Sequence, residues 1–300
     1  MIRSTASTGS SRGIAAIVGV GPKLGRSIAR KFAHHGYTVA ILARDLGRLS
    51  RVAEEIAREE KAQVFAIRID CSDSKSVRDA FEGVHSLGFV EVLVYNANYQ
   101  PLSPNPVSFH HIHLDTFQNS VAVSAVGAFH CAQQVLKGMV ERGKGTILFT
   151  GCSASVNAIP GYSQICCGKF ALRALAQCLA REFQPQGVHI AHVIIDGVVA
   201  PPSYCRRKSG SVGDESISSR EDEGTVDPDA VAQTYWHLHI QDRTAWTQEM
   251  DLRSNTATFF QASSSGDEGL NLSIIMDPVA VAAAAEGVEH GMGPALEKGV

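Results

Sequence analysis

Several features that would assign this sequence of 300 residues to other protein classes are missing from it. No apolar run is long enough to span a membrane, and no apolar segment of a secretory signal peptide opens the chain. The net charge is −3 and no basic stripe is present, which argues against a nucleic-acid partner. The seven cysteines form no Cys-x-x-Cys pair, so the pattern supports neither a zinc site nor a thioredoxin-like motif. These absences predict a cytoplasmic protein with reduced cysteines and no membrane or nucleic-acid partner.

The composition that remains predicts a folded domain with a weakly structured end. Hydrophobic residues make up 44% of the chain and charged residues 19%, a balance typical of globular domains that bury a core without disulfides or metals. We predict a flexible N-terminus over residues 1–12 and one domain over residues 13–262. Residues 263–300 break the pattern with glycines and an alanine run, and we expect a disordered tail there.

Short apolar runs alternate with helical patterns along the domain. Strands that alternate with helices predict parallel βαβ units. The expected fold class is therefore α/β: a three-layer Rossmann fold with a doubly wound parallel sheet of about seven strands and helices on both faces. The predicted strands are residues 13–19, 38–43, 64–70, 90–97, 145–150, 189–196 and 247–252. The predicted helices are residues 24–36, 45–60, a segment from residue 74, and residues 117–141, 162–184 and 228–240.

A polar segment interrupts this alternation before the last helix. Residues 201–226 are rich in Ser, Gly and Glu, and we expect a mobile loop there. Asp227 and Pro228 follow as a suitable N-cap and first residue for a helix.

A glycine-rich turn lies between the first predicted strand and the first predicted helix. Gly19 and Gly21 would let the backbone turn tightly and approach a pyrophosphate, and Gly25 would let the helix pack closely. Lys23 and Leu24 stand at the start of that helix, whose unpaired N–H groups and partial positive charge favour a phosphate. The alternative is a tight turn without a ligand. The full strand–turn–helix context favours the dinucleotide site.

The end of the second predicted strand indicates which dinucleotide would bind. An acid at that position would bind the ribose diol of NAD, but Ala43 occupies it and Arg44 follows. Arg44 can pair with a 2′-phosphate, and Lys23 could add positive charge. We therefore predict NADP (NADPH) as the cofactor, the alternative being that Arg44 is an ordinary solvated side chain.

These motifs together resemble those of the short-chain dehydrogenase/reductase family, over about residues 13–260. The first and last glycines match that family's TGxxxGxG pattern, with Lys23 at its middle glycine. Asp70 resembles the acid that contacts adenine in the family, and Asn96 begins an element that borders the cofactor. By the same resemblance Lys169 would bind the nicotinamide ribose. The resemblance also implies a homodimer or homotetramer.

The reactive centre departs from the family pattern. The segment 160–169 resembles the family's Tyr-x-x-x-Lys helix, with Lys169 retained and Ile165 at the position of the catalytic tyrosine. The catalytic serine position is Cys152 and the asparagine position is Ser124. This pattern is similar to that of a divergent branch of the family that lacks the active-site tyrosine and keeps the lysine.

Other side chains could compensate for the missing tyrosine. Tyr162 could share a helix face with Lys169, although it is also an ordinary residue of the family's Pro-Gly-Tyr element. Cys152 and Ser153 could polarise a carbonyl, or they could simply be small packing residues. The predicted catalytic residues are therefore Lys169, Cys152, Ser153 and Tyr162. No metal is expected, because the histidines at 110–113 have no acid or cysteine at ligand spacing.

The resemblance implies an atypical NADP-dependent oxidoreductase that transfers hydride between the nicotinamide and a small carbonyl or alcohol substrate. One alternative is a catalytically impaired NADP-binding protein with a regulatory or structural role. A second alternative is isomerisation or elimination on the same scaffold.

Overall fold

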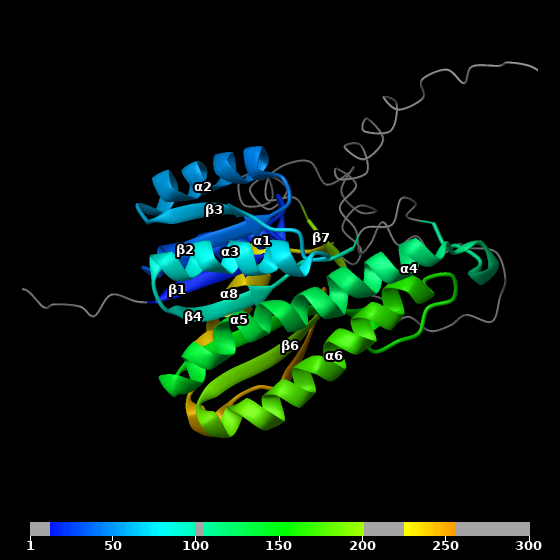
Figure 1. Ribbon diagram of the computed structural model, residues 1–300. Coiled ribbons are helices and arrows are strands. Elements are labelled where there is room, and N and C mark those ends of the chain that lie inside the picture. Colours follow the sequence, from blue (N-terminus) through cyan, green and yellow to red (C-terminus); the bar gives the residue numbers. More distant parts are fainter. Residues whose placement is uncertain (1–12, 100–104, 201–224, 256–300) are drawn as a thin grey trace, which may run out of the picture.

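Strands and helices alternate along the chain in the computed structural model, as the sequence predicts (Figure 1). The structure describes residues 13–99, 105–200 and 225–255. The strands of the main sheet are β1 (Ile14–Val18), β2 (Thr38–Ala43), β3 (Val64–Arg68), β4 (Val90–Tyr95), β5 (Gly145–Cys152), β6 (Val188–Asp196) and β9 (Glu249–Arg253). The α-helices are α1 (Leu24–His34), α2 (Leu46–Glu60), α3 (Ser74–Leu87), α4 (Leu114–Val121), α5 (Gly127–Glu141), α6 (Ser163–Phe183) and α8 (Pro228–His239).

The strands of the main sheet all run parallel, in the order β3-β2-β1-β4-β5-β6-β9. The strand order reverses at β1, which lies between β2 and β4, so the sheet is doubly wound. The predicted fold class is therefore confirmed. The domain boundaries stay a prediction, because residues 1–12 and 256–300 lie outside the described part of the chain.

Helices cover both faces of the sheet. Figure 1 shows α5 and α6 crossing one face, and these two helices and α3 share an apolar core with the strands. The buried side chains of α1, α2 and α8 form the core on the other face. Because both faces are covered, every residue of β1 is buried, which explains its uninterrupted apolar sequence. Leu24, Ile28 and Phe32, which recur at helical spacing, are buried in the second core.

The structure differs from the long helix predicted over residues 117–141. The helix begins at Leu114 and is interrupted by a π turn, η2 (Ala122–Val126), that joins α4 to α5. Within this turn the carbonyl of Val123 accepts a hydrogen bond from the hydroxyl of Tyr95. Single π turns in α-helices often accompany functional sites. The periodicity of apolar residues does not reveal so local a change.

Part of the predicted loop over residues 201–226 is a strand. β8 (Thr225–Val226) pairs in parallel with β7 (Val198–Val199), and residues 201–224 lie outside the described part of the chain. A pairing of two residues on each side is too short to produce a recognisable alternation. The predicted helix start that follows is confirmed, because Asp227 is the N-cap of α8 and accepts a hydrogen bond from the N–H of Asp229.

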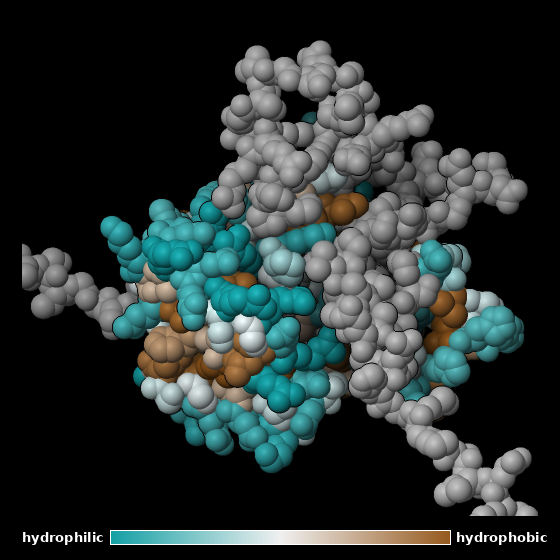
Figure 2. Space-filling view, turned by 90° about the horizontal axis from the view of Figure 1, so that it is seen from above, coloured by the Kyte–Doolittle hydropathy of each residue, from teal (hydrophilic) through white to brown (hydrophobic). Residues whose placement is uncertain are grey.

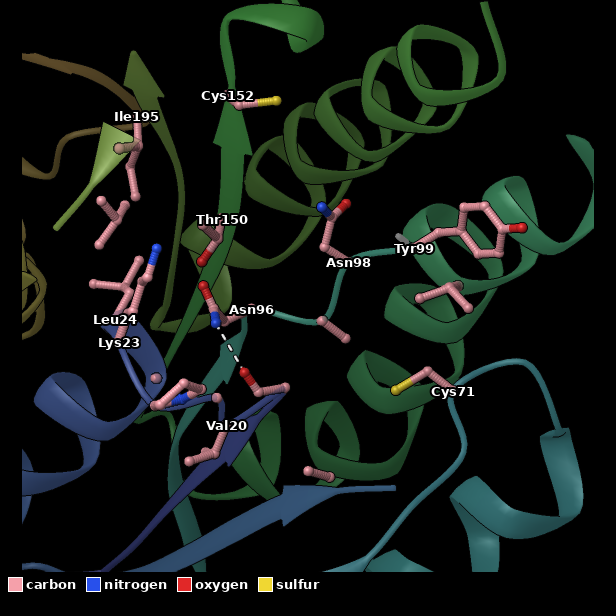
Figure 3. A pocket seen from close by; sticks show the side chains of 18 of the residues that line it. Val20, Lys23, Leu24, Cys71, Asn96, Asn98, Tyr99, Thr150, Cys152 and Ile195 are labelled. Carbon is pink, nitrogen blue, oxygen red and sulfur yellow. Dashed lines mark hydrogen bonds between the residues drawn. The ribbon is translucent and has the colours of Figure 1, made fainter. Parts of the chain in front are cut away.

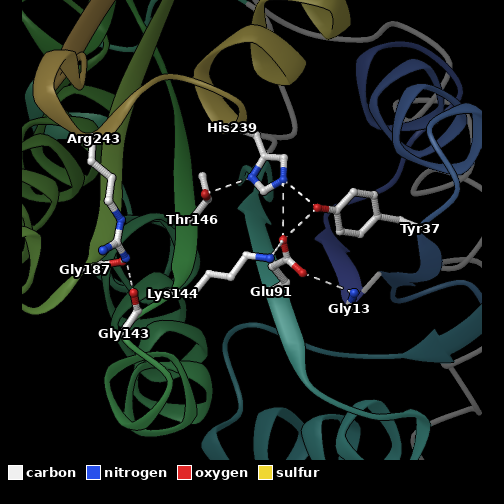
Figure 4. A network of polar contacts seen from close by, with 9 residues as sticks. All are labelled: Gly13, Tyr37, Glu91, Gly143, Lys144, Thr146, Gly187, His239 and Arg243. Atoms are coloured by element: carbon white, nitrogen blue, oxygen red, sulfur yellow. Dashed lines mark hydrogen bonds and ion pairs between the residues drawn. The ribbon is translucent and has the colours of Figure 1, made fainter. Parts of the chain in front are cut away.

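A buried carboxylate fixes the end of the sheet where β1 and β4 begin (Figure 4). Glu91 is 5% exposed and accepts hydrogen bonds from the Tyr37 hydroxyl at 2.9 Å and from the Gly13 N–H at 3.2 Å. Its carboxylate also lies 2.8 Å from the ammonium of Lys144. Burial alone would raise the pKa of Glu91, but Lys144 and Tyr37 lower it below its ordinary value. The charge is therefore compensated, as a buried charge must be.

On the face seen in Figure 2, hydrophilic side chains surround the hydrophobic ones. Figure 2 shows hydrophobic residues gathered in separate patches on the face seen from above. Among the described helices, none combines the length and the apolar character that crossing a membrane requires.

Candidate functional site

A cavity of about 360 Å³ opens at the carboxyl ends of the central strands. It is bounded by the segments that follow β1, β2 and β4 and by the ends of β5 and β6. This is where open α/β sheets bind their ligands. Every residue that the sequence predicts for cofactor binding lines this cavity: Gly19, Gly21, Lys23, Leu24, Gly25, Arg44, Asp70, Asn96 and Lys169.

The turn after β1 has a shape that only glycine permits at its first position. Gly19 adopts a φ of +85°, and a Cβ atom there would lie 2.3 Å from the backbone nitrogen of Ala97. A Cβ atom on Gly25 would lie 2.8 Å from the Cα of Val20, so this glycine lets α1 start directly against the turn. Gly21 differs, because a Cβ there would meet nothing within 4 Å. Its backbone is therefore open to the cavity, as contact with a phosphate requires.

Asn96 holds this turn in place from the end of β4. Its side-chain amide donates a hydrogen bond of 2.9 Å to the carbonyl of Gly19, drawn as a dashed line in Figure 3. At the other side of the turn, Lys23 is the N-cap of α1, and its side chain forms no capping hydrogen bond with the first turn of that helix. The N–H groups of that turn and the helix dipole therefore favour an anion in the cavity.

The end of the cavity near β2 and β3 carries both signs of charge. Arg44 is exposed at the end of β2, and Arg48 lies one turn later at the start of α2. Asp70 accepts hydrogen bonds from the backbone N–H and the hydroxyl of Ser72 at 2.9 and 2.6 Å. Burial alone would raise the pKa of Asp70, but Ser72 and Arg44 lower it below its ordinary value. An acceptor and two guanidinium groups thus stand at this end.

Lys169 and Cys152 meet at the opposite end of the cavity. Lys169 is 4% exposed, and its ammonium donates a hydrogen bond of 3.2 Å to the carbonyl of Thr150. Burial lowers the pKa of Lys169 below its ordinary value, and Cys152 acts in the opposite direction. Cys152 ends β5 and is 6% exposed. Figure 3 shows its sulfur at the top of that strand, next to the cavity.

Ser153 and Tyr162 do not line the cavity within the described part of the chain. Ser153 is buried in a short 3₁₀ turn, where its carbonyl accepts the N–H groups of Val156 and Asn157. Tyr162 is buried just before α6, and its ring packs in a small apolar cluster with Cys152 and Ile165. The structure therefore brings two of the four predicted catalytic residues together in the cavity. The roles of all four stay predictions.

The cavity wall also contains side chains outside the predicted cofactor-binding and catalytic residues. Asn98 follows the Asn-Ala pair after β4, and its buried Oδ1 atom has no hydrogen-bond partner among the described residues. Tyr99 comes next, and Figure 3 shows its ring turned away from Cys152. Thr150 and Arg48 complete this set. Thr150 could have been found from its place in the same strand as Cys152, and Arg48 from its spacing of four from Arg44.

The family model for short chain dehydrogenases matches residues 13–204. This chain belongs to the short-chain dehydrogenase family. A short-chain dehydrogenase/reductase of Hericium erinaceus is 32% identical over 218 residues, which cover 71% of this chain and 82% of that one. The resemblance to this family is therefore confirmed, and membership of the branch that lacks the tyrosine stays a prediction.

Two further relatives of this short-chain dehydrogenase carry more specific names. A protein of Xanthobacter autotrophicus named inactive 2-(S)-hydroxypropyl-CoM dehydrogenase 2 is 29% identical over 194 residues, which cover 64% of this chain and 80% of that one. The X-ray structure of an alcohol dehydrogenase from the archaeon Thermococcus sibiricus, complexed with 5-hydroxy-NADP, is 25% identical. It covers 81% of this chain and 97% of its own, with a TM-score of 0.68.

Proposed function

We propose that this short-chain dehydrogenase is an NADP-dependent oxidoreductase acting on a small carbonyl or alcohol substrate. The observation that carries the proposal is one continuous cavity with the glycine turn and Arg44 at one end and Lys169 with Cys152 at the other. A dinucleotide bound along the carboxyl ends of parallel strands would reach from one end of this cavity to the other. We further propose a cytoplasmic protein that works as a homodimer or homotetramer.

The residues of the cavity fit an NADP molecule. The backbone of Gly21 and the first turn of α1 would bind the pyrophosphate. The space around Gly21 is open, and the first turn of α1 has N–H groups without partners inside the helix. Arg44 and Arg48 would pair with the 2′-phosphate. No acid stands at the end of β2 to take the ribose diol that NAD offers. The alcohol dehydrogenase of Thermococcus sibiricus, solved with 5-hydroxy-NADP, supports this choice.

The reactive end fits a carbonyl or alcohol group. When bound, the nicotinamide supplies or accepts the hydride. Lys169 would donate hydrogen bonds to the nicotinamide ribose and, with a pKa lowered by burial, would also be the proton donor to the substrate oxygen. Cys152 would hold that oxygen through its weakly donating thiol. Ser153 and Tyr162 have no part in this scheme, because neither lines the cavity.

The second candidate function is a catalytically impaired NADP-binding protein. Ile165 is buried, and by the sequence resemblance it stands at the position of the family's tyrosine, where it has no proton to give. General acid catalysis typically contributes about 10²–10⁴-fold, so turnover without a phenol would be slow. The Xanthobacter relative, whose name includes the word inactive, supports this second candidate.

Calorimetric titration of the purified chain with NADPH and with NADH tests the first proposal. We expect NADPH to bind more tightly than NADH, and Arg44→Ala to weaken NADPH binding by about 10-fold or more while leaving NADH binding unchanged. Arg51→Ala is the matched control, because Arg51 lies on α2 but does not line the cavity. Equal loss in both variants would contradict a 2′-phosphate site at Arg44.

A panel of small aldehydes, ketones and alcohols then separates the two candidates. Turnover that Lys169→Met abolishes supports the oxidoreductase. NADPH binding without turnover of any compound supports the impaired protein. Product formation without net change of the nicotinamide would indicate isomerisation or elimination instead.

A further inference from the structure

A buried amide oxygen on the cavity wall lacks a hydrogen-bond partner. Asn98 lies just after β4 and lines the cavity, and its Oδ1 atom is buried without a partner among the described residues. No other cavity-lining residue in the described part of the chain leaves a buried side-chain nitrogen or oxygen unpaired. Buried polar atoms in proteins are almost always hydrogen-bonded. This oxygen therefore indicates a ligand that donates a hydrogen bond to it.

The backbone that precedes Asn98 is fixed against the glycine turn. The N–H of Asn96 donates to the carbonyl of Val18 at 2.8 Å, and the side-chain amide of Asn96 donates to the carbonyl of Gly19 at 2.9 Å. Ala97 packs so closely on Gly19 that a Cβ atom on that glycine would collide with the Ala97 backbone. Asn98 is the next residue, so its position relative to the turn is set by these contacts.

The order of the strands places Asn98 between the two ends of the proposed cofactor site. β4 pairs with β1 on one side and with β5 on the other. The glycine turn follows β1, whereas Thr150 and Cys152 of β5, with Lys169 bonded to the Thr150 carbonyl, form the reactive wall. Neighbouring strands lie about 4.8 Å apart, so the end of β4 stands midway in a gap of roughly 10 Å. A dinucleotide that reaches from the turn to Lys169 crosses this strand end.

The reactive wall itself is poor in hydrogen-bond acceptors. The carbonyl and the hydroxyl of Thr150 are already bonded, to Lys169 and to Tyr235. The ammonium of Lys169 can only donate, and the thiol of Cys152 accepts weakly. In Figure 3 the Asn98 amide points toward the end of the cavity that holds Cys152. Asn98 thus brings to this end an acceptor of ordinary strength.

We propose that Asn98 is a cofactor-binding residue whose Oδ1 atom accepts a hydrogen bond from a hydroxyl of the nicotinamide ribose. That ribose follows the pyrophosphate along the cofactor, so it would lie over the strand next to the glycine turn. Lys169 would donate to an oxygen of the ribose diol, and the hydroxyl hydrogen then needs an acceptor. The inference rests on the proposed function, which assigns Lys169 to the same ribose, and it adds a second residue for that half of the cofactor.

Calorimetric titration of the full chain with three ligands tests this assignment. NADPH contains the whole nicotinamide half, ADP-ribose 2′-phosphate contains its ribose without the nicotinamide, and adenosine 2′,5′-bisphosphate contains neither. Asn98→Leu replaces the amide by a hydrocarbon of similar size. We expect this variant to bind the first two ligands about 5–10-fold more weakly and the third within about twofold of the parent.

The matched control makes the same chemical change away from the cavity. Asn119 is exposed on α4 and does not line the cavity. Asn119→Leu should therefore bind all three ligands as the parent does. An equal loss of affinity in Asn119→Leu and Asn98→Leu would overturn the inference.

A second variant keeps the test decisive if Asn98→Leu does not fold. Asn98→Ala removes the oxygen and adds no bulk, and it should weaken binding of the same two ligands. The inference is overturned if folded Asn98→Ala binds all three ligands like the parent, or if it weakens NADPH alone, because the amide would then face the nicotinamide. It is also overturned if adenosine 2′,5′-bisphosphate loses as much affinity as NADPH, because the glycine turn itself would then have changed.

The two proposals fail in distinguishable ways. A parent chain that binds no dinucleotide refutes the proposed function and this inference with it. A parent that binds NADH in place of NADPH refutes only the choice of NADP, and the same comparison is then made with NADH, ADP-ribose and AMP. A parent that binds NADPH, together with Asn98 variants that bind it equally tightly, refutes the role of Asn98 alone.

Discussion

Gly151 offers the sharpest test of the packing behind the reactive wall. A Cβ atom at this position would lie 2.2 Å from Nε2 and 2.6 Å from Cε1 of His192, and 2.9 Å from the Ser155 hydroxyl. The φ of Gly151 lies outside the left-handed region, so its backbone accepts an alanine without strain. The consequence of Gly151→Ala is therefore decided mainly by the contact with the His192 ring, and the Ser155 hydroxyl is the lesser contact.

His192 has little freedom to move away from an added methyl group. Glu249 holds its Nδ1 atom, Arg173 holds both oxygens of Glu249, and Gly151 pairs with Ile194 in the ladder between β5 and β6. Overpacking a core costs about 1–3 kcal/mol. Displacing the ring would instead lose a hydrogen bond to a charged group, worth about 1.5–3 kcal/mol. Both routes predict that Gly151→Ala lowers the free energy of unfolding by about 1–3 kcal/mol.

Urea unfolding of the full chain measures this difference. Gly138→Ala is the control, because an added Cβ there meets nothing within 4 Å and the residue lies inside α5. That variant should raise the free energy of unfolding by about 0.5–1 kcal/mol. In a His192→Ala background the cost of Gly151→Ala should largely disappear, since the obstructing ring is gone. A cost that stays the same in that background would refute the reasoning.

Three further predictions follow from named contacts. The free energy of unfolding should fall by on the order of 3 kcal/mol as the pH drops from about 6.5 to about 4, because the unfolded chain protonates His192 while the folded chain does not. Denaturant titrations of His192→Gln should show a free energy of unfolding that depends less on pH in this range. Asn96→Ala should lower the free energy of unfolding by about 1 kcal/mol and weaken NADPH binding, since the amide no longer holds the carbonyl of Gly19; unchanged calorimetric affinity would contradict this role. Tyr162→Phe should leave any measured turnover within about threefold of the parent, since general acid catalysis is worth far more; a loss of about 100-fold would instead establish Tyr162 as the missing acid.

Much of the fold could be predicted because burial on both faces leaves a clear trace in the sequence. The residues of β1 are all apolar for that reason, and the stripe of Leu24, Ile28 and Phe32 faces a core. The features that the sequence did not predict involve few residues. The π turn shifts the helix by a single residue, and β7 with β8 pairs only two residues on each side.

The candidate site was less predictable at its reactive end. The glycine turn is local, so the sequence order of Gly19, Gly21 and Gly25 nearly determines its shape. The wall near Lys169 is assembled from β5, β6, α6 and β9, and its contacts join residues far apart in the sequence. His192 and Glu249 are 57 positions apart, and neither belongs to a recognisable motif. Tyr162 illustrates the same limit, because its spacing from Lys169 suits a shared helix face while its position just before α6 buries it elsewhere.

The order of the strands also divides the site along the chain. The groups at the dinucleotide end come from residues 19–71 and 96–99, and those at the reactive end from residues 150–199, with Glu249 behind them. In the sheet, the two parts adjoin at the boundary between β4 and β5. Substitutions at the reactive end, such as Ile165, therefore fall on elements other than those that form the glycine turn.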